Sequence, residues 1–417
     1  MTTPTRPAPP SLRHSRRFMS FWAGETVSQF GDRISELALP LIAVLTLAAT
    51  PTQVGLLTAA IWAPNVLSLL VGTWVDQVRH KKRLLVAADL LRAVVLLSLP
   101  VAAWQGWLSL GQLFVIAVLT GLGQVLFSTA YPTFFVGLVD RSQYVEANSK
   151  VSGTRSMSFV VGPAVGGWLV QVFTAPIAVL LDAVSFVASA VLIGRIPVPD
   201  APPASSEGST LARAREGLGY VMGHRTLRAS LACVTTVNLF TFMAQALVVL
   251  FASRTLGLSP GVLGLAFGVG ALGGVLGAVV ATRLARRFGV GRMAVLGAIL
   301  FPAPIAVLAL AGGPPPVAAA VLAVAEFFSG LGVMLLDINL MAIQTAATAD
   351  ALRSRVAGVF GSINYGVRPL GAVAGGLLGD SLGVRPTLVV AGIGGALCFL
   401  WLLPSAIPSF RTVDDVV

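Results

Sequence analysis

Twelve long apolar runs divide the chain, and they constrain its fold more than any other feature. The runs are Phe21–Leu47, Val54–Val75, Leu84–Trp104, Leu110–Val136, Val151–Phe173, Ala175–Ile193, Leu231–Phe251, Val262–Leu284, Met293–Ala311, Val317–Thr345, Val356–Leu378 and Thr387–Leu403. Most reach the ~20 residues that a helix needs to cross a bilayer. None alternates polar and apolar residues as a β-barrel strand does. We therefore predict an all-α integral membrane protein with twelve transmembrane helices.

The composition leads to the same class. Of 417 residues, 56% are hydrophobic and 11% are charged, whereas a soluble domain carries about 25% charged residues. So few charges cannot cover a water-exposed surface.

The basic residues indicate an orientation. Lys and Arg number 28 against 17 Asp and Glu, and they gather in alternate loops between the runs. The opposite loops carry only Arg254 and Arg385. Cytoplasmic loops are enriched in Lys and Arg, so we expect a multi-pass protein of the cell (inner) membrane with both termini cytoplasmic. The same distribution explains the +11 charge without a nucleic-acid partner.

An internal repeat predicts two halves. Gly121-Leu-Gly123 returns as Gly330-Leu-Gly332, and Gly162–Leu169 returns in similar form as Gly371–Leu378, both 209 residues later. Parallel six-helix halves with a central site are a known transporter plan. We expect a disordered cytoplasmic tail (1–17), an N-terminal half (18–196), a linker with an amphipathic surface helix (197–226), a C-terminal half (227–404) and a cytoplasmic tail (405–417).

The sequence contains no set of residues that is typical of an enzyme's active site. Cys233 and Cys398 lie inside apolar runs, and the three histidines lie outside them, so we expect no disulfide, metal site or catalytic triad. Gly268-x-Gly270-x-x-Gly273 matches a dinucleotide fingerprint but lies within an apolar run and follows no strand. We predict no enzyme activity and no cofactor.

Charged residues inside the runs are the candidates for function, because each costs about 2.5–3.5 kcal/mol at the bilayer centre on insertion scales. They are Glu25, Asp32, Arg33, Glu36, Asp89, Arg92, Asp182, Glu326, Asp337 and Arg368, with Arg155 at the start of the fifth run. Glu25, Asp32 and Glu36 share one helix face, and Asp32 lies near mid-membrane. Burial disfavours a charged carboxylate and a nearby arginine favours it, so Asp32 first and Glu36 second are predicted proton carriers. A static Arg33–Glu36 pair is the structural alternative.

Arg368 lies at the centre of the eleventh run and needs a buried anion. Asp32, Glu36, Glu326 and Asp337 are candidates, which gives either a switchable pair between the halves or a structural pair with Asp337. An anchor for an anionic substrate is the third possibility. Polar side chains in other runs are predicted to line a cavity, with ordinary hydrogen bonding between helices as the alternative; they are Asn65, Asn238, Thr241 and Gln245.

Three segments resemble the major facilitator superfamily. Gly72 and Asp76, followed by Lys81, Lys82 and Arg83, are similar to its loop signature. Gly162 and Pro163, followed by Gly166 and Gly167, are similar to the Gly-Pro motif of exporters. The opening of the first run, Phe21–Leu41, resembles drug:proton antiporter-like exporters of the macrolide-efflux and enterobactin-exporter branch.

The resemblance implies roles for these segments. The loop signature implies close helix approach at Gly72 and a cytoplasmic latch at Asp76, while the Gly-Pro motif implies a tight seam and antiport. The chain departs from the loop signature at Gln77 and Arg79. It also lacks an arginine in the fourth run, where Ala117 and Leu119 stand, so that proton release in that run needs another basic residue.

These features together predict a monomeric, proton-coupled secondary transporter that exports a small amphipathic molecule, such as an antibiotic, siderophore or other metabolite. Its partners are the lipid bilayer, the substrate and protons. Two alternatives stay open: a proton-coupled nutrient importer of the same fold, and a membrane scaffold or sensor that transports nothing.

Overall fold

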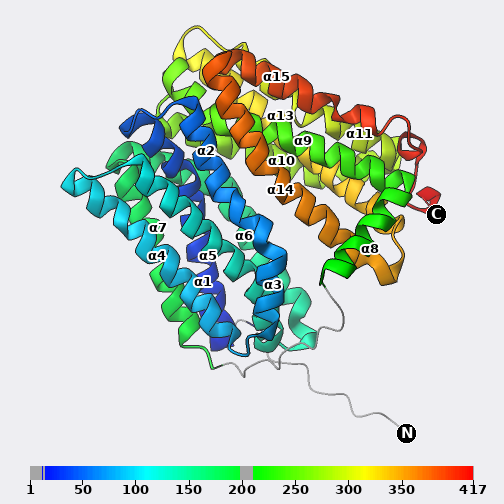
Figure 1. Cartoon of the computed structure of the whole chain (residues 1–417), viewed down its shortest axis with the longest axis horizontal. Coiled ribbons are helices and arrows are strands. Elements are labelled where there is room, and N and C mark those ends of the chain that lie inside the picture. The colour runs from blue at the N-terminus through cyan, green and yellow to red at the C-terminus, as the bar shows by residue number, and fades with distance from the viewer. Residues whose placement is uncertain (1–11, 13–14, 198–209, 417) are drawn as a thin grey trace.

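The computed structural model describes residues 12, 15–197 and 210–416. Within these residues the chain is helical and has no β-strand. Two helical bundles lie side by side, one from each half of the chain (Figure 1).

Each of the twelve predicted runs lies in a helix or in helices that continue one another. The N-terminal half contains α1 (Arg16–Leu41) with the π-helix η2 (Ile42–Thr46), α2 (Pro51–Trp62), η3 (Ala63–Leu67), α3 (Ser68–Gln77), α4 (Lys81–Gln105), α5 (Leu110–Leu138), α6 (Tyr144–Phe173) and α7 (Ala175–Gly194). The C-terminal half contains α9 (Arg225–Leu250) with the π-helix η5 (Phe251–Thr255), α10 (Pro260–Phe288), α11 (Val290–Leu300), α12 (Ala303–Ala309), α13 (Pro315–Ala346), α14 (Arg353–Ser381) and α15 (Val384–Ala396) with η7 (Leu397–Trp401).

Length and hydropathy agree with twelve crossings. Nine helical segments of the described residues are long and apolar enough to span a membrane, and the bent pair of α2 and α3 makes a tenth. The remaining two, α1 and α14, are 26 and 29 residues long but less apolar, because α1 carries the acidic face and α14 carries arginines and many glycines.

The boundaries of the predicted tails need one adjustment. Helix α1 begins at Arg16, with Ser15 as its N-cap, so the predicted boundary at residue 17 is two residues late. Most of the predicted N-terminal tail and of the Pro-rich linker lies outside the described residues. The amphipathic segment after that linker forms α8 (Thr210–Gly223).

The two halves repeat each other in detail. The π-helices η2 and η5 begin at residues 42 and 251, which are separated by the same 209 positions as the sequence motifs. In the same register, Pro51 begins α2 and Pro260 begins α10. The predicted pseudo-symmetry is therefore visible in the local backbone.

At one end of the bundles, here called the closed end, α2 packs on α14 and α6 packs on α10. A methyl group on Gly55 would lie 2.9 Å from Cα of Gly376, and one on Gly264 would lie 2.9 Å from Cα of Gly167. These two crossings are equivalent under the repeat. Only glycine lets the backbones approach so closely.

Hydrogen bonds between the halves also follow the repeat at the closed end. The amide of Thr52 donates to Asp380 Oδ2 at 3.0 Å, and the equivalent amide of Gly261 donates to Gln171 Oε1 at 2.9 Å. Arg254 adds a contact without a counterpart, because its guanidinium donates to the carbonyl oxygens of Val44 at 2.6 Å and Ala49 at 2.8 Å.

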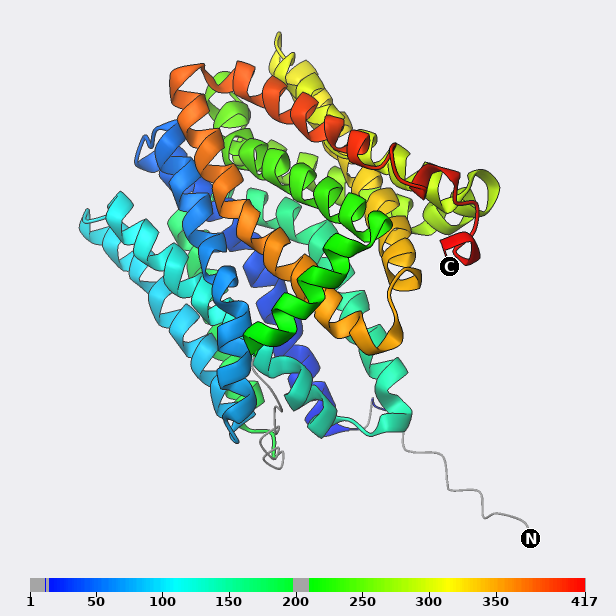
Figure 2. The ribbon, with the colours of Figure 1, turned by 45° about the vertical axis from the view of Figure 1, so that its right-hand side comes forward.

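At the opposite end, here called the basic end, the arginine-rich loops lie and the halves diverge. A cleft of about 510 Å³ opens there between α3, α8 and α14. Helix α8 packs on α14 at this end (Figure 2). An ion pair between Glu216 and Arg355, and a hydrogen bond of 3.2 Å from the Tyr220 hydroxyl to the carbonyl oxygen of Ala347, hold it there.

Candidate functional site

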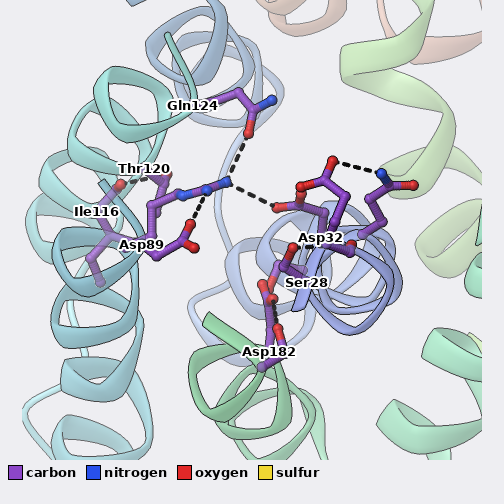
Figure 3. Close-up of polar contacts among 12 residues, drawn as sticks. Ser28, Asp32, Asp89, Ile116, Thr120, Gln124 and Asp182 are labelled. Atoms are coloured by element: carbon purple, nitrogen blue, oxygen red, sulfur yellow. Dashed lines mark hydrogen bonds and ion pairs between the residues drawn. The ribbon is translucent and has the colours of Figure 1, made fainter. Parts of the chain in front are cut away.

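A buried arginine organises the polar face of α1. Arg92 of α4 donates to Gln124 Oε1 of α5 at 2.8 Å and forms an ion pair with Asp89 one turn earlier. Asp32 of α1 places Oδ1 3.8 Å from Arg92 Nη1. Figure 3 shows Asp32, Asp89 and Gln124 around this guanidinium. These four residues are called the Arg92 network below.

Side chains of the neighbouring helices α5 and α7 explain why this arginine fits inside the bundle. The rings of Phe186 and Phe127 face the guanidinium of Arg92 at 4.0 and 5.1 Å, which offsets part of the cost of removing it from water. A methyl group on Gly123 would lie 2.7 Å from Arg92 Cγ. The predicted glycine motif in α5 therefore makes room for this side chain.

Asp32 and Glu36 have different surroundings. The Asp32 side chain is 34% exposed while contacting the Arg92 network. Glu36 is 58% exposed and accepts a hydrogen bond of 2.6 Å from Arg33 Nη1. The alternative Arg33–Glu36 pair is thus present, and Asp32 is the partly exposed acid that lies beside a buried base.

Two more acids are buried, Glu25 on α1 itself and Asp182 on the neighbouring α7. Glu25 accepts from the side-chain amide of Gln29 at 2.7 Å. Asp182 of α7 accepts from the hydroxyls of Ser35 and of Ser185, the latter at 3.2 Å. The N-terminal half therefore holds two buried acids, Glu25 and Asp182, in addition to the two carboxylates of the Arg92 network.

The sequence signalled part of this arrangement. Asp89 and Arg92 are spaced by three residues within one apolar run, as a helical ion pair requires. Asp89, Arg92 and Asp182 are among the charged candidates of the sequence, and Arg92, like Arg33 and Arg368, is a candidate to replace the arginine missing from the fourth run. Gln124 is not predicted, because the sequence does not show which way α4 and α5 turn toward α1.

Arg368 of α14 does not form the predicted ion pairs in this conformation. Its Nε donates to Asn238 Oδ1 at 3.3 Å, and aromatic rings face its guanidinium. No carboxylate oxygen of the described residues lies within 4.0 Å of it. Both the pair with Asp32 and the pair with Asp337 are therefore absent here, because Asp32 belongs to the Arg92 network and Asp337 lies exposed on α13.

The other predicted lining residues are spread along the bundle. The side-chain amides of Asn65 and Asn238 donate to carbonyl oxygens of their own helices, at 3.3 and 2.9 Å. Gln245 is exposed, while Thr241 and Glu326 are half-buried. Glu326 packs against α10, where a methyl group on Gly270 would lie 2.9 Å from Glu326 Cβ.

The loop signature lies at the basic end. Gly72 and Asp76 line the cleft there together with Arg355 of α14. Nothing lies within 4 Å of a methyl group placed on Gly72. The expected close helix approach at Gly72 is therefore wrong for this conformation, because the halves have moved apart at this end.

The basic residues of the signature cap helices. The ammonium group of Lys81 donates to the carbonyl oxygen of Val75 near the end of α3. Lys82 donates to the carbonyl oxygens of Ile196 at 3.1 Å and Gly194 at 3.4 Å, at the end of α7. Both cations complement the negative ends of helix dipoles, whereas Arg83 is exposed.

The Gly-Pro motif lies between α1 and α10. A methyl group on Gly162 would lie 2.5 Å from Arg33 Cβ, and one on Gly166 would lie 3.1 Å from Ile34 Cα. Gly167 forms one of the crossings at the closed end, and the carbonyl group of Pro163 also faces that crossing. The predicted tight seam is therefore present.

Residues that hold a metal ion do not come together in the part of the chain that the structure describes. No three His, Cys, Asp or Glu side chains of that part are grouped as metal ligands. Cys233 and Cys398 are free thiols buried in the C-terminal half.

The helical halves, their seam at one end and charged groups inside them define a secondary transporter of the major facilitator type. The model of the transmembrane secretion effector family matches residues 8–416. The chain belongs to this family, and the resemblance to drug exporters of the superfamily is confirmed.

Relatives and solved structures agree with this class. The chain is 28% identical to the multidrug efflux pump Tap of Mycolicibacterium fortuitum, over 84% of this chain and 85% of that one. It is 24% identical to macrolide efflux protein A of Streptococcus pyogenes, over 54% and 56%. A bacterial homologue of the iron transporter ferroportin in the inward-facing state superposes with a TM-score of 0.73 at 16% identity, over 95% of this chain and 99% of that one. A bacterial homologue of the lysosomal transporter Spinster, also inward-facing, gives 0.70 at 14%, over 96% and 98%.

Proposed function

We propose that the protein is a proton-coupled exporter of small amphipathic molecules that works by alternating access. The basic end is then cytoplasmic, and the structure is the inward-facing state. The multidrug and macrolide efflux relatives support export over import. The observation that carries proton coupling is the geometry of Asp32, a carboxylate within α1 that is 34% exposed and 3.8 Å from a buried guanidinium.

The Arg92 network gives a physical route for coupling. Two unit charges about 4 Å apart attract by about 4 kcal/mol at an effective dielectric constant near 20. In the outward-facing state, a proton that reaches Asp32 from outside cancels this attraction and leaves Arg92 to Asp89 and Gln124, so that Asp32 is released from α4. In the inward-facing state described here, loss of that proton to the cytoplasm restores the contact between Asp32 and Arg92. One charge crossing 100 mV supplies about 2.3 kcal/mol, which is comparable with the interaction that must be broken.

Asp32 is the proton carrier in this proposal, and Glu36 is secondary because Arg33 already pairs with it. The Arg92 network thereby takes the part that the resemblance gives to an arginine in the fourth run. Asp76 and Arg355, which face one cleft, would form the latch when the basic end closes.

Transport by the purified full-length protein in liposomes tests the proposal. An antiporter accumulates a non-titrating fluorescent amphiphile in the lumen when the lumen is acidic, because protons leave as the substrate enters. A symporter, the importer alternative, accumulates it when the outside is acidic, and a scaffold behaves like protein-free liposomes. Either of these last two results would overturn the proposal.

A further inference from the structure

Arg368 lies in a box of three aromatic side chains. The rings of Trp62, Tyr365 and Phe242 lie 4.6, 4.6 and 4.8 Å from its guanidinium carbon. Asn238 accepts from Nε at 3.3 Å. These residues and Arg368 are called the Arg368 box. Trp62 comes from the N-terminal half and the others from the C-terminal half, so the box is assembled from both.

The box leaves one edge of the guanidinium open. Arg33 and Arg92 each have a carboxylate within 4.0 Å, and Arg254 donates to two carbonyl oxygens. Among the described residues, the side chain of Arg368 forms only the hydrogen bond from Nε. Its two Nη groups therefore have no acceptor there. Asp337 attracts Arg368 electrostatically but lies beyond 4.0 Å. A guanidinium in a membrane interior is costly without an anion.

The box lies along α14 from the cleft at the basic end. Arg368 is half-buried, and Tyr365 is 37% exposed. Gly361 lies seven residues earlier, hence on the same face of α14, and nothing lies within 4 Å of a methyl group placed on it. Ser362 lines the cleft of about 510 Å³ at the basic end. The box and the cleft therefore lie within two turns of each other on α14.

We propose that the Arg368 box binds the anionic group of the exported amphiphile, a carboxylate attached to an aromatic ring. The two Nη groups match the two oxygens of a carboxylate and bind it as a fork, while the ring of the substrate stacks on the aromatic side chains. This assignment of a substrate class rests on the proposed function. It also gives the aromatic rings a role, since they remove water from the guanidinium and strengthen its contact with an anion.

Binding of two matched probes to the purified full-length protein in detergent tests the proposal. Coumarin-3-carboxylate and coumarin-3-carboxamide share a ring system and differ in charge. We expect wild-type protein to bind the carboxylate more tightly. Arg368→Gln should weaken carboxylate binding about 10- to 100-fold, as expected for charge-assisted hydrogen bonds, and change carboxamide binding little. Arg368→Lys, which keeps the charge but not the fork, should fall between.

The control is Arg287→Gln, because Arg287 is an exposed arginine in the last turn of α10 that also stacks on one ring, Phe288 at 5.3 Å. It should bind both probes like wild type. Equal affinity of wild type for both probes, binding of neither, or equal loss of both in Arg368→Gln would overturn the assignment. Proton-driven transport of a neutral amphiphile by wild type tests the proposed function separately, because that transport does not need an anionic group.

Discussion

The closed end can be opened by one methyl group. Gly264 of α10 crosses Gly167 of α6, and an alanine methyl at 264 would lie 2.3 Å from the carbonyl oxygen of Pro163 and 2.9 Å from Gly167 Cα. Ordinary van der Waals contact begins near 3.4 Å, so the helices must separate by roughly 1 Å to clear the Pro163 carbonyl oxygen. Overpacking of this kind costs about 1–3 kcal/mol.

That cost falls on one conformation only. When the halves rock and the closed end opens, α6 and α10 separate there and the methyl group has room. Gly264→Ala should therefore shift the equilibrium toward the outward-open state by the same 1–3 kcal/mol, which is about 5- to 150-fold.

Pulsed electron–electron distance measurements can detect this shift. Spin labels on cysteines at Gln105 and Ser381 report the separation of the halves, because both positions are exposed, lie near the closed end and belong to different halves. Gly264→Ala should add a longer distance to the distribution. Gly111→Ala is the matched control, since nothing lies within 4 Å of its methyl group at the start of α5. An unchanged distribution in Gly264→Ala would refute the claim that this seam is packed to its limit.

Three further changes have defined outcomes. Arg254→Gln removes two hydrogen bonds between the halves and should shift the same spin-label distances outward; an unchanged distribution would show that these bonds do not hold the end closed. Arg92→Gln leaves Asp89 buried without its cation and should destabilise the protein by about 3–5 kcal/mol, while Arg92→Gln with Asp89→Asn recovers much of it in thermal unfolding. Lys82→Met removes the cap of α7 and should cost about 0.3–1 kcal/mol with efflux preserved; lost efflux at normal stability would instead favour a gating role.

The sequence predicts the architecture because a bilayer leaves the backbone few choices. Every peptide group in hydrocarbon must be hydrogen-bonded within its own segment, so that each apolar run becomes a helix. The 209-residue repeat predicts equivalent halves, and the paired crossings at Gly55 and Gly264 follow the same register. Which end is closed depends on the conformational state, and for this reason the expectation for Gly72 was wrong.

The candidate site is less predictable. Asp32 stands out because a charge near mid-membrane is costly, and its sequence position alone shows this. Its partner Arg92 lies on another helix, and the contact depends on how α1 and α4 are rotated about their axes. The aromatic rings around Arg368 likewise come from three helices, α2, α9 and α14. Periodicity within one helix carries no information about such contacts.

Gradient-driven accumulation by Asp32→Asn in liposomes tests the role of the α1 carboxylate most directly. The variant removes the titratable group and keeps the side chain's size. Glu146→Gln, which removes an exposed acid paired with Lys150 near the basic end, serves as the control. We expect Asp32→Asn to bind and exchange substrate yet fail to accumulate it under a pH gradient, while the control accumulates it like wild type. Full gradient-driven accumulation by Asp32→Asn would contradict the account.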